Sequence, residues 1–331
     1  MKENNIFLIK KFVDKQIPKY MDIIEVEETE DIVQTQKIVK IFSKQIRELE
    51  EDDFIEVMIS CFIPDTYRDN GRREKLYTKL AEVVVGEWWR RLGGKIVIPT
   101  TKSGTEDVEL IIEDISIVCD AKIFRLGRSQ KAPNAKDFLK SASVKLWIDN
   151  LVEKYKKIGK EQRVVGGMVT YSSLHEWKKK SEVYQECTNK EIPIAMLSYE
   201  ILALLLKKKD NYELKDFIQL WNYDDKFEKA TKFKNEYWKE INEFIIALLD
   251  ISKDEYEELI NEYRKEITVS VEKYKSIIEQ EIIDYDNEIS EKLNSFDSIE
   301  DMKEYVKEEL SSYFKKQCND YLNRIDKFRK F

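Results

Sequence analysis

Five short segments rich in apolar and β-branched residues lie between residues 95 and 199, and long stretches with helical spacing flank them on both sides. In order, these segments read KIVIP, DVELII, ISIVCDAK, RVVGGMVTY and IPIAMLSY. A helical stretch, KDFLKSASVKLWIDNLVEKYKK, separates the third segment from the fourth. Such runs, bounded by turn residues, are typical of strands, whereas apolar residues three and four apart are typical of helices. The order therefore predicts an α/β core with helical elaborations at both ends.

Helical spacing dominates the two ends of the chain. Before the strands it covers QTQKIVKIFSKQIRELEEDDFIEVMI and REKLYTKLAEVVVGEWWRRL, and Gly93 and Gly94 end the second stretch. After the strands it covers SYEILALLLKK, ELKDFIQLW and a charged region in which Ser252 and Glu255 predict a capping box. We expect an N-terminal helical region over 1–92 that packs on the core, a central α/β core over 93–200 and a C-terminal helical region over 201–331. The last is either part of one compact unit or a separate subdomain.

The available residue types restrict the chemistry. His175 is the one histidine among the 331 residues, which argues against Ser-His-Asp, Cys-His and histidine-ligated metal mechanisms. The four cysteines are far apart and show no CxxC spacing, which argues against a zinc site. We interpret His175 as structural, and the Trp88-Trp89 pair as part of the core rather than a platform for base stacking. If the chain is an enzyme, carboxylates and lysines must carry out the chemistry.

The net charge of -8 is unevenly distributed. Residues 251–331 contain 21 acidic and 14 basic residues, whereas residues 120–145 contain seven basic and two acidic residues. The second range is a local basic patch that suits phosphate groups. No run approaches the roughly 18 apolar residues of a membrane helix, and the first residues lack the pattern of a signal peptide. We therefore expect a cytoplasmic protein without a membrane partner.

Asp120 and Lys122 stand at the end of the third predicted strand, immediately before the basic patch. The same D/E-x-K spacing also begins at Glu176, Asp224 and Asp301, so the pattern alone distinguishes nothing. At a strand end, however, side chains two residues apart share a face and lie about 7 Å apart along the strand. This position makes Asp120 and Lys122 candidates for a shared site.

The second and third segments can form an antiparallel hairpin whose turn is Glu113-Asp114. The register then pairs Ile112 with Ile115, Leu110 with Ile117 and Val108 with Cys119. It also places Asp107 opposite Asp120, with their Cβ atoms about 5 Å apart. Two facing carboxylates are unfavourable unless one is protonated or a cation lies between them, and magnesium suits such a site.

Two alternatives remain open for this pair. Glu-Asp is not a favoured two-residue turn, so a bulge or a longer turn would shift the register. The acidic groups could also be surface charges at a strand end, with Lys122 neutralising one of them.

An acidic residue followed by a D-x-K triplet at the end of the next strand resembles the PD-(D/E)xK nuclease superfamily. More specifically, the stretch CDAKIFRLGRSQKAPNAKDF resembles the HindIII family of type II restriction endonucleases. The resemblance continues through EKLYTKLAEVVVGEW and SGTEDVEL upstream and through SYEILALLL and LKDFIQLWN downstream, over roughly residues 70 to 225. It implies that residues 93–200 form a catalytic PD-(D/E)xK nuclease core, in which helices flank a mixed central sheet. If the C-terminal region over 201–331 is a separate subdomain, it would then serve for dimerisation or for embracing DNA.

The resemblance also implies roles for single residues. Asp107, Asp120 and the Ala121 carbonyl would bind magnesium, while Lys122 would orient or activate the attacking water. Asp137 would be a further catalytic acid, whereas Thr100 or Thr101 stands where the family has another acidic residue. The implied DNA-binding residues are Arg125, Arg128, Lys131, Asn134 and Lys136. Among these, Arg125, Arg128, Lys131 and Lys136 would position the phosphate backbone, while Asn134 could read adenine and Lys136 could also read guanine.

The implied function is that of a magnesium-dependent type II restriction endonuclease. It would hydrolyse phosphodiester bonds of double-stranded DNA at a short palindromic site, of which AAGCTT, read by the family's founding member, is an example. A homodimer matches a palindrome by symmetry, and a cognate DNA methyltransferase would act on the same site. Two alternatives remain: a repair or recombination nuclease of the same fold, and a non-catalytic DNA-binding protein.

Overall fold

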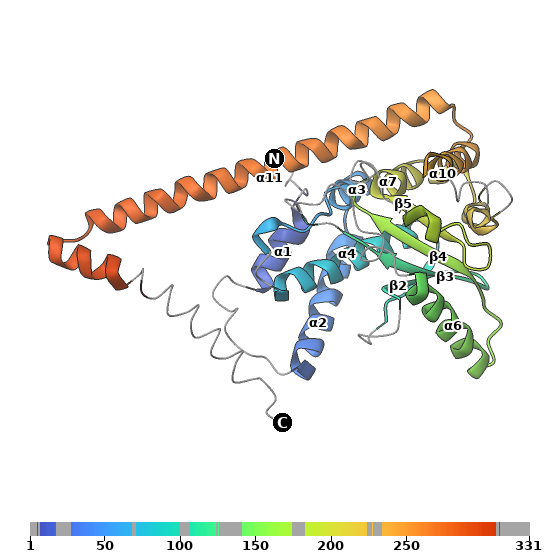
Figure 1. The fold of residues 1–331 in the computed structure, drawn as a ribbon, viewed down its shortest axis with the longest axis horizontal. Coiled ribbons are helices and arrows are strands. Elements are labelled where there is room, and N and C mark those ends of the chain that lie inside the picture. Colours follow the sequence, from blue (N-terminus) through green and yellow to red (C-terminus); the bar gives the residue numbers. More distant parts are fainter. Residues whose placement is uncertain are drawn as a thin grey trace. The chain divides into compact units, whose positions relative to one another are not determined.

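The computed structural model describes residues 5, 7–17, 28–67, 71–99, 106–123, 125, 141–173, 183–223, 227, 234–308 and 311. The chain divides into two compact units, Met1–Ser270 and Val271–Phe331. Figure 1 shows the elements in sequence colours, and the central sheet lies in the first unit.

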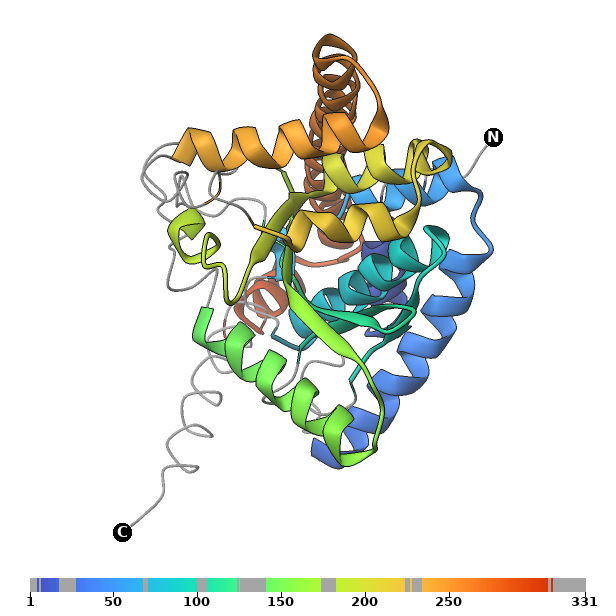
Figure 2. The same cartoon turned by 90° about the vertical axis from the view of Figure 1, so that its right-hand side faces the viewer.

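The sheet of the first unit has five strands, which follow one another in chain order (Figure 2). The strands are β1 (Lys95–Val97), β2 (Val108–Ile112), β3 (Ile115–Ala121), β4 (Arg163–Tyr171) and β5 (Ile194–Ser198). The pairs β1-β2 and β2-β3 are antiparallel, whereas β3-β4 and β4-β5 are parallel. All five predicted strands are confirmed, and so is the predicted class, a mixed sheet flanked by helices.

Helices cover both faces of this sheet. Helix α4 (Gly71–Arg91) packs on β1, β2 and β3, where Gly86 lies against the side chains of Ile96 and Val108. Helix α6 (Ser141–Lys157) packs on β3 and β4, where its Val144 lies against Gly167. Because side chains alternate between the faces of a strand, the two helices bury opposite sets of β3 residues. The strand β3, which carries Asp120 near its end, is therefore covered by one helix on each face.

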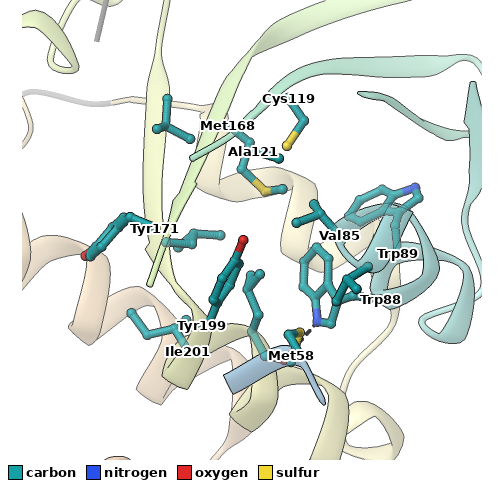
Figure 3. Packing of buried hydrophobic residues seen from close by; sticks show 14 of the residues in the cluster. Met58, Val85, Trp88, Trp89, Cys119, Ala121, Met168, Tyr171, Tyr199 and Ile201 are labelled. Carbon is teal, nitrogen blue, oxygen red and sulfur yellow. Dashed lines mark hydrogen bonds between the residues drawn. The ribbon is translucent and has the colours of Figure 1, made fainter. Parts of the chain in front are cut away.

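The core joins α4 to the sheet, to α3 (Glu51–Ile59) and to α7 (Tyr199–Lys207) (Figure 3). Trp88 and Trp89 are completely buried there. The Nε1 of Trp88 donates a hydrogen bond of 2.8 Å to the Leu202 carbonyl, and that of Trp89 donates one of 3.1 Å to the Ile111 carbonyl. Both indole N–H groups are thus satisfied inside the protein, as buried tryptophans require. The prediction that this pair belongs to the core is confirmed.

The N-terminal helices differ from the prediction at one point. Helices α1 (Leu8–Gln16) and α2 (Glu28–Arg47) precede α3, and the predicted helical stretch over residues 34–59 is broken at 48–50. Glu50 is extended there, with φ of -60° and ψ of 160°, and α3 begins directly after it with three acidic residues in its first turn. Acidic side chains stabilise a helix N-terminus, so this cluster marks a new helix rather than a continuation.

The remaining elements of the described chain are helical. After α7 come α8 (Leu214–Phe217), α10 (Lys234–Leu249) and α11 (Lys253–Asn294), and short 3-10 helices occupy Asp65–Tyr67, Val183–Glu186, Lys209–Asn211 and Ile218–Trp221. The Glu255 N–H donates to the Ser252 hydroxyl at 3.1 Å, which confirms the first half of the predicted capping box. The Glu255 carboxylate instead forms an ion pair with Lys208 at 2.9 Å. Within the described residues, no helix is both long and apolar enough to cross a membrane.

Gly93 ends α4 in a left-handed conformation, with φ of +96° and no neighbouring atom within 4 Å of the place of a Cβ. We expect Gly93→Ala to lower the free energy of unfolding by about 1–2 kcal/mol, because an alanine is strained in this region. Gly71→Ala is the matched control, since Gly71 has equal space and no left-handed φ. It should leave stability unchanged or raise it by about 0.4–1 kcal/mol. Urea denaturation measures both, and equal effects would contradict the strain argument.

Candidate active site

The hairpin of β2 and β3 brings Asp107 and Asp120 together. Its register pairs Val108 with Cys119, Leu110 with Ile117 and Ile112 with Ile115, as predicted. The turn has only two residues, and Glu113 adopts the positive φ of 49° that such tight turns need. The Asp107 N–H donates to the Cys119 carbonyl at 3.1 Å, so the pairing continues beyond the first residue of β2. Glu-Asp therefore forms the short turn despite its low preference.

The Asp107 side chain reaches across to the end of β3. Its Oδ2 accepts a hydrogen bond of 3.0 Å from the Ala121 N–H, next to Asp120. Asp120 itself is only 4% exposed. Burial raises the pKa of Asp120 to about 7, and the nearby charge of Asp107 adds to this rise, although Lys122 opposes it. The buried carboxylate of Asp120 thus lies close to a second carboxylate, which is costly unless a cation or a proton compensates the pair.

Lys122 supplies a positive charge at this position. Its Nζ lies 2.8 Å from Asp120 Oδ1, and its side chain is 35% exposed, so the ammonium group borders both the carboxylate and solvent. The Lys122 N–H donates to the Thr170 carbonyl of β4 at 3.1 Å. This hydrogen bond fixes the backbone of Lys122 to the neighbouring strand of the sheet. Burial lowers the pKa of Lys122, but the attraction of Asp120 outweighs it and the net pKa is raised.

A third carboxylate near this pair comes from α4 and was not predicted. Glu82 is buried, and it forms an ion pair with Lys79 one turn earlier on the same helix. Burial raises the pKa of Glu82 to about 8, and the charges of Asp107 and Asp120 contribute to the rise. Glu82 therefore belongs to the same electrostatic cluster. The available signal was an acidic residue inside the apolar run LAEVVV, on the buried face of a helix.

The predicted DNA-binding residues lie mostly outside the described residues. This is the case for Arg128, Lys131, Asn134 and Lys136, and also for the predicted catalytic Asp137 and for His175, Thr100 and Thr101. Arg125 is described, and its guanidinium forms an ion pair with Glu74 of α4. Its backbone also forms an isolated bridge with Ile63. The predicted DNA-binding residues therefore remain predictions, and so does the catalytic role of Asp137.

Asp107 and Asp120 fit a magnesium ion better than a metal held by protein ligands alone. Within the part of the chain that the structure describes, no three His, Cys, Asp or Glu side chains are arranged to hold a metal. Magnesium, however, is usually bound by one or two carboxylates and keeps several of its waters. The two facing aspartates supply this number of hard oxygen ligands, and their mutual repulsion would be relieved by a cation.

Comparisons with known proteins identify the family. A model of the HindIII restriction endonuclease family matches residues 22–312, which is most of the chain. The match makes the chain a member of the restriction endonucleases, a class of nucleases. In particular, it belongs to the HindIII restriction endonuclease family.

Two further comparisons add little to this assignment. The search of curated proteins found no match. Among solved structures, the small subunit of the heterodimeric restriction endonuclease R.BspD6I is similar, with 16% sequence identity and a TM-score of 0.30. That match covers 65% of this chain and 98% of the other. The family assignment rests on the family match alone.

Proposed function

We propose that the protein is a magnesium-dependent type II restriction endonuclease that hydrolyses phosphodiester bonds of double-stranded DNA at a short palindromic site. The observation that carries this proposal is the pair of facing carboxylates, Asp107 and Asp120, with the Lys122 ammonium 2.8 Å from Asp120. The family match supports the class of enzyme. AAGCTT is the first candidate for the site, on the resemblance of the basic segment that follows Lys122.

The proposed roles follow from the chemistry of each group. Asp107, Asp120 and the Ala121 carbonyl would hold the magnesium ion, which would polarise the scissile phosphate and lower the pKa of a bound water. Lys122 would hold the attacking water in line and stabilise the charge that develops on the phosphate oxygens. Glu82 would add negative charge to the metal site from the side of α4. Asp137 is proposed as a further acid on the resemblance alone.

The basic segment would hold the substrate against these groups. Arg125, Arg128 and Lys131 are proposed to contact phosphates, which supply affinity without sequence information. Asn134 and Lys136 are proposed to read base edges in the major groove, where amide and ammonium groups can recognise adenine and guanine. A palindromic site would be read by a homodimer, and a cognate DNA methyltransferase would protect the same site without a stable complex.

Plasmid digestion with and without magnesium tests this function. We expect a discrete set of fragments with magnesium and none in the presence of a chelator, and sequencing of the fragment ends gives the recognition site. Heterogeneous or junction-specific cutting would instead support a repair or recombination nuclease. Binding without any cutting would support a non-catalytic DNA-binding protein.

Asp107→Asn tests the metal site separately. The amide oxygen can still accept the hydrogen bond from Ala121, so the hairpin should keep its geometry, but the negative charge is lost. We expect the magnesium concentration for half-maximal cleavage to rise at least about tenfold, since even outer partners of metal ligands are worth about 10–100-fold in affinity. Magnesium titrations of the cleavage rate measure this shift. An unchanged titration curve would remove Asp107 from the ligand set.

A further inference from the structure

A cavity of about 560 Å³ lies in the first unit, between α10, the first half of α11 and the junction of β5 with α7. Cavities of about 300–1,000 Å³ commonly hold small organic ligands. Trp238 of α10 forms part of its apolar lining, together with Ile201, Ile246 and Ile260. An edge-to-face contact with Tyr237, at 4.8 Å between ring centres, holds the Trp238 ring in place. The cavity therefore offers an aromatic and aliphatic wall to a ligand.

The uncompensated positive charge of this cavity belongs to Arg264. The other two basic residues of the lining each form an ion pair of 3.7 Å with a glutamate one turn away, namely Lys239 with Glu243 and Lys253 with Glu257. Arg264 has no carboxylate partner among the described residues. Its Nη1 donates to the Asn261 side chain at 3.2 Å, and its Nε is buried without a hydrogen-bond acceptor. Such a guanidinium gains acceptors when an anion binds.

Two amide side chains of the lining present further donors. The Asn261 side-chain oxygen accepts from Arg264, and the Asn242 side-chain oxygen accepts from the Tyr256 hydroxyl at 2.8 Å. Because each amide oxygen already has a donor, each side chain presents chiefly its NH2 group to a ligand. Guanidinium and amide donors in one cavity fit the oxygens of a phosphate. A nucleotide combines a phosphate with the apolar and planar parts that suit the opposite wall.

The cavity reaches the edge of the sheet that carries the proposed active site. Ala121 of β3 pairs with Thr170 of β4, and Thr170 pairs with Leu197 of β5. Ser198, the last residue of β5, lines the cavity. Adjacent strands are about 4.8 Å apart, so the cavity begins about 10 Å from the end of β3. At about 3.4 Å per nucleotide of one strand, this distance corresponds to about three nucleotides of DNA.

We propose that this cavity binds one nucleotide of the DNA substrate, about three positions from the scissile phosphate. Arg264 and the amide groups of Asn242 and Asn261 hold its phosphate, while Trp238 contacts its sugar or base. The inference rests on the proposed function and extends the DNA contact from the basic segment after Lys122 to α10 and α11. A free nucleotide has the same chemistry, so the experiment includes it as a separate ligand.

Two substitutions that each lower the charge of the cavity by one unit test this site. Arg264→Gln removes the guanidinium. Asn261→Asp keeps Arg264 but places a carboxylate where the amide oxygen now accepts its hydrogen bond, and this should not destabilise the helix, because Asp and Arg three positions apart attract each other. Lys265→Gln is the matched control, since it makes the same change of charge on an exposed neighbour outside the lining. Circular dichroism verifies that each protein is folded.

DNA binding is measured with a chelator over a series of salt concentrations, and a random-sequence duplex is sufficient because a phosphate contact carries no sequence information. We expect Arg264→Gln and Asn261→Asp each to bind about tenfold more weakly than the wild type. The slope of log K against log salt should become shallower by about 0.9 in both, because one phosphate contact is lost. Arg264→Lys keeps the charge and should keep the wild-type slope, and Lys265→Gln should change neither quantity.

Deoxyadenosine monophosphate is the second ligand, and isothermal titration calorimetry measures its binding to the wild type and to Arg264→Gln. If only this ligand loses affinity in the variant while duplex binding is unchanged, the cavity serves free nucleotides and the assignment to DNA is overturned. Unchanged binding of both ligands, or an equal loss in Lys265→Gln, would overturn the proposal altogether. A wild type that binds no duplex would contradict the proposed function as well, whereas a failure confined to the variants leaves that function untouched.

Discussion

Asp120→Asn is expected to abolish DNA cleavage while the protein stays folded. The amide has the size of the carboxylate but lacks the charge that would bind magnesium and that pairs with Lys122 at 2.8 Å. The loss should amount to several kcal/mol of transition-state stabilisation, which is at least about a thousandfold in rate. Folding should tolerate the change, because Asp120 is 4% exposed and burial raises its pKa to about 7. A neutral group therefore suits this position in the metal-free protein.

The rate of plasmid cleavage and the thermal melting curve together check this expectation. Asp114→Asn is the matched control, because it makes the same substitution in the exposed turn at the other end of the same hairpin. It should cleave at the wild-type rate. Near-wild-type turnover of Asp120→Asn would remove Asp120 from the site, whereas loss of the folded state would leave the rate uninterpretable and call for Asp120→Ser as a smaller neutral replacement.

The part of this site that depends on strand register could be predicted from the sequence. Apolar residues alternate along both strands of the hairpin, and a shift by one residue would move each apolar set to the opposite face. The two-residue turn between Ile112 and Ile115 then leaves one pairing, which places Asp107 beside Asp120. The apolar pattern of the two strands and the observed fold agree here. Residues close together in the sequence were therefore sufficient to predict the register of the hairpin.

Other features depend on contacts between distant segments and could not be predicted in this way. Glu82 approaches Asp107 and Asp120 only because α4 packs on the sheet in one particular position. The ion pair between Arg125 and Glu74 also depends on the packing of α4, since it joins a residue that follows β3 to this helix. The break at residues 48–50 is different, because helical spacing is preserved on both sides of it and only the acidic residues that follow reveal a new N-terminus.

Lys122→Ala should reduce the rate of cleavage at least about a hundredfold, and additional magnesium should not restore it. The ammonium group borders both Asp120 and solvent, so it is accessible to a phosphate and its attacking water. Its removal takes away a positive charge that would stabilise the transition state, a kind of loss that costs about a hundredfold or more in other enzymes. Asp107→Asn acts on metal affinity instead, so high magnesium should recover much of its activity. Lys95→Ala, at an exposed position of β1 in the same sheet, is the control and should behave as the wild type.

Magnesium titrations of the cleavage rate distinguish these two roles. If Lys122 acts on the water and the phosphate, the plateau of the Lys122→Ala curve falls while its midpoint moves little. If Lys122 served only to neutralise Asp120 at a strand end, its removal would leave that carboxylate free for the metal, and the plateau would match the wild type. A wild-type plateau would therefore reduce Lys122 to a surface ion pair of the kind that contributes little. A lowered plateau with an unchanged midpoint would make it a catalytic group.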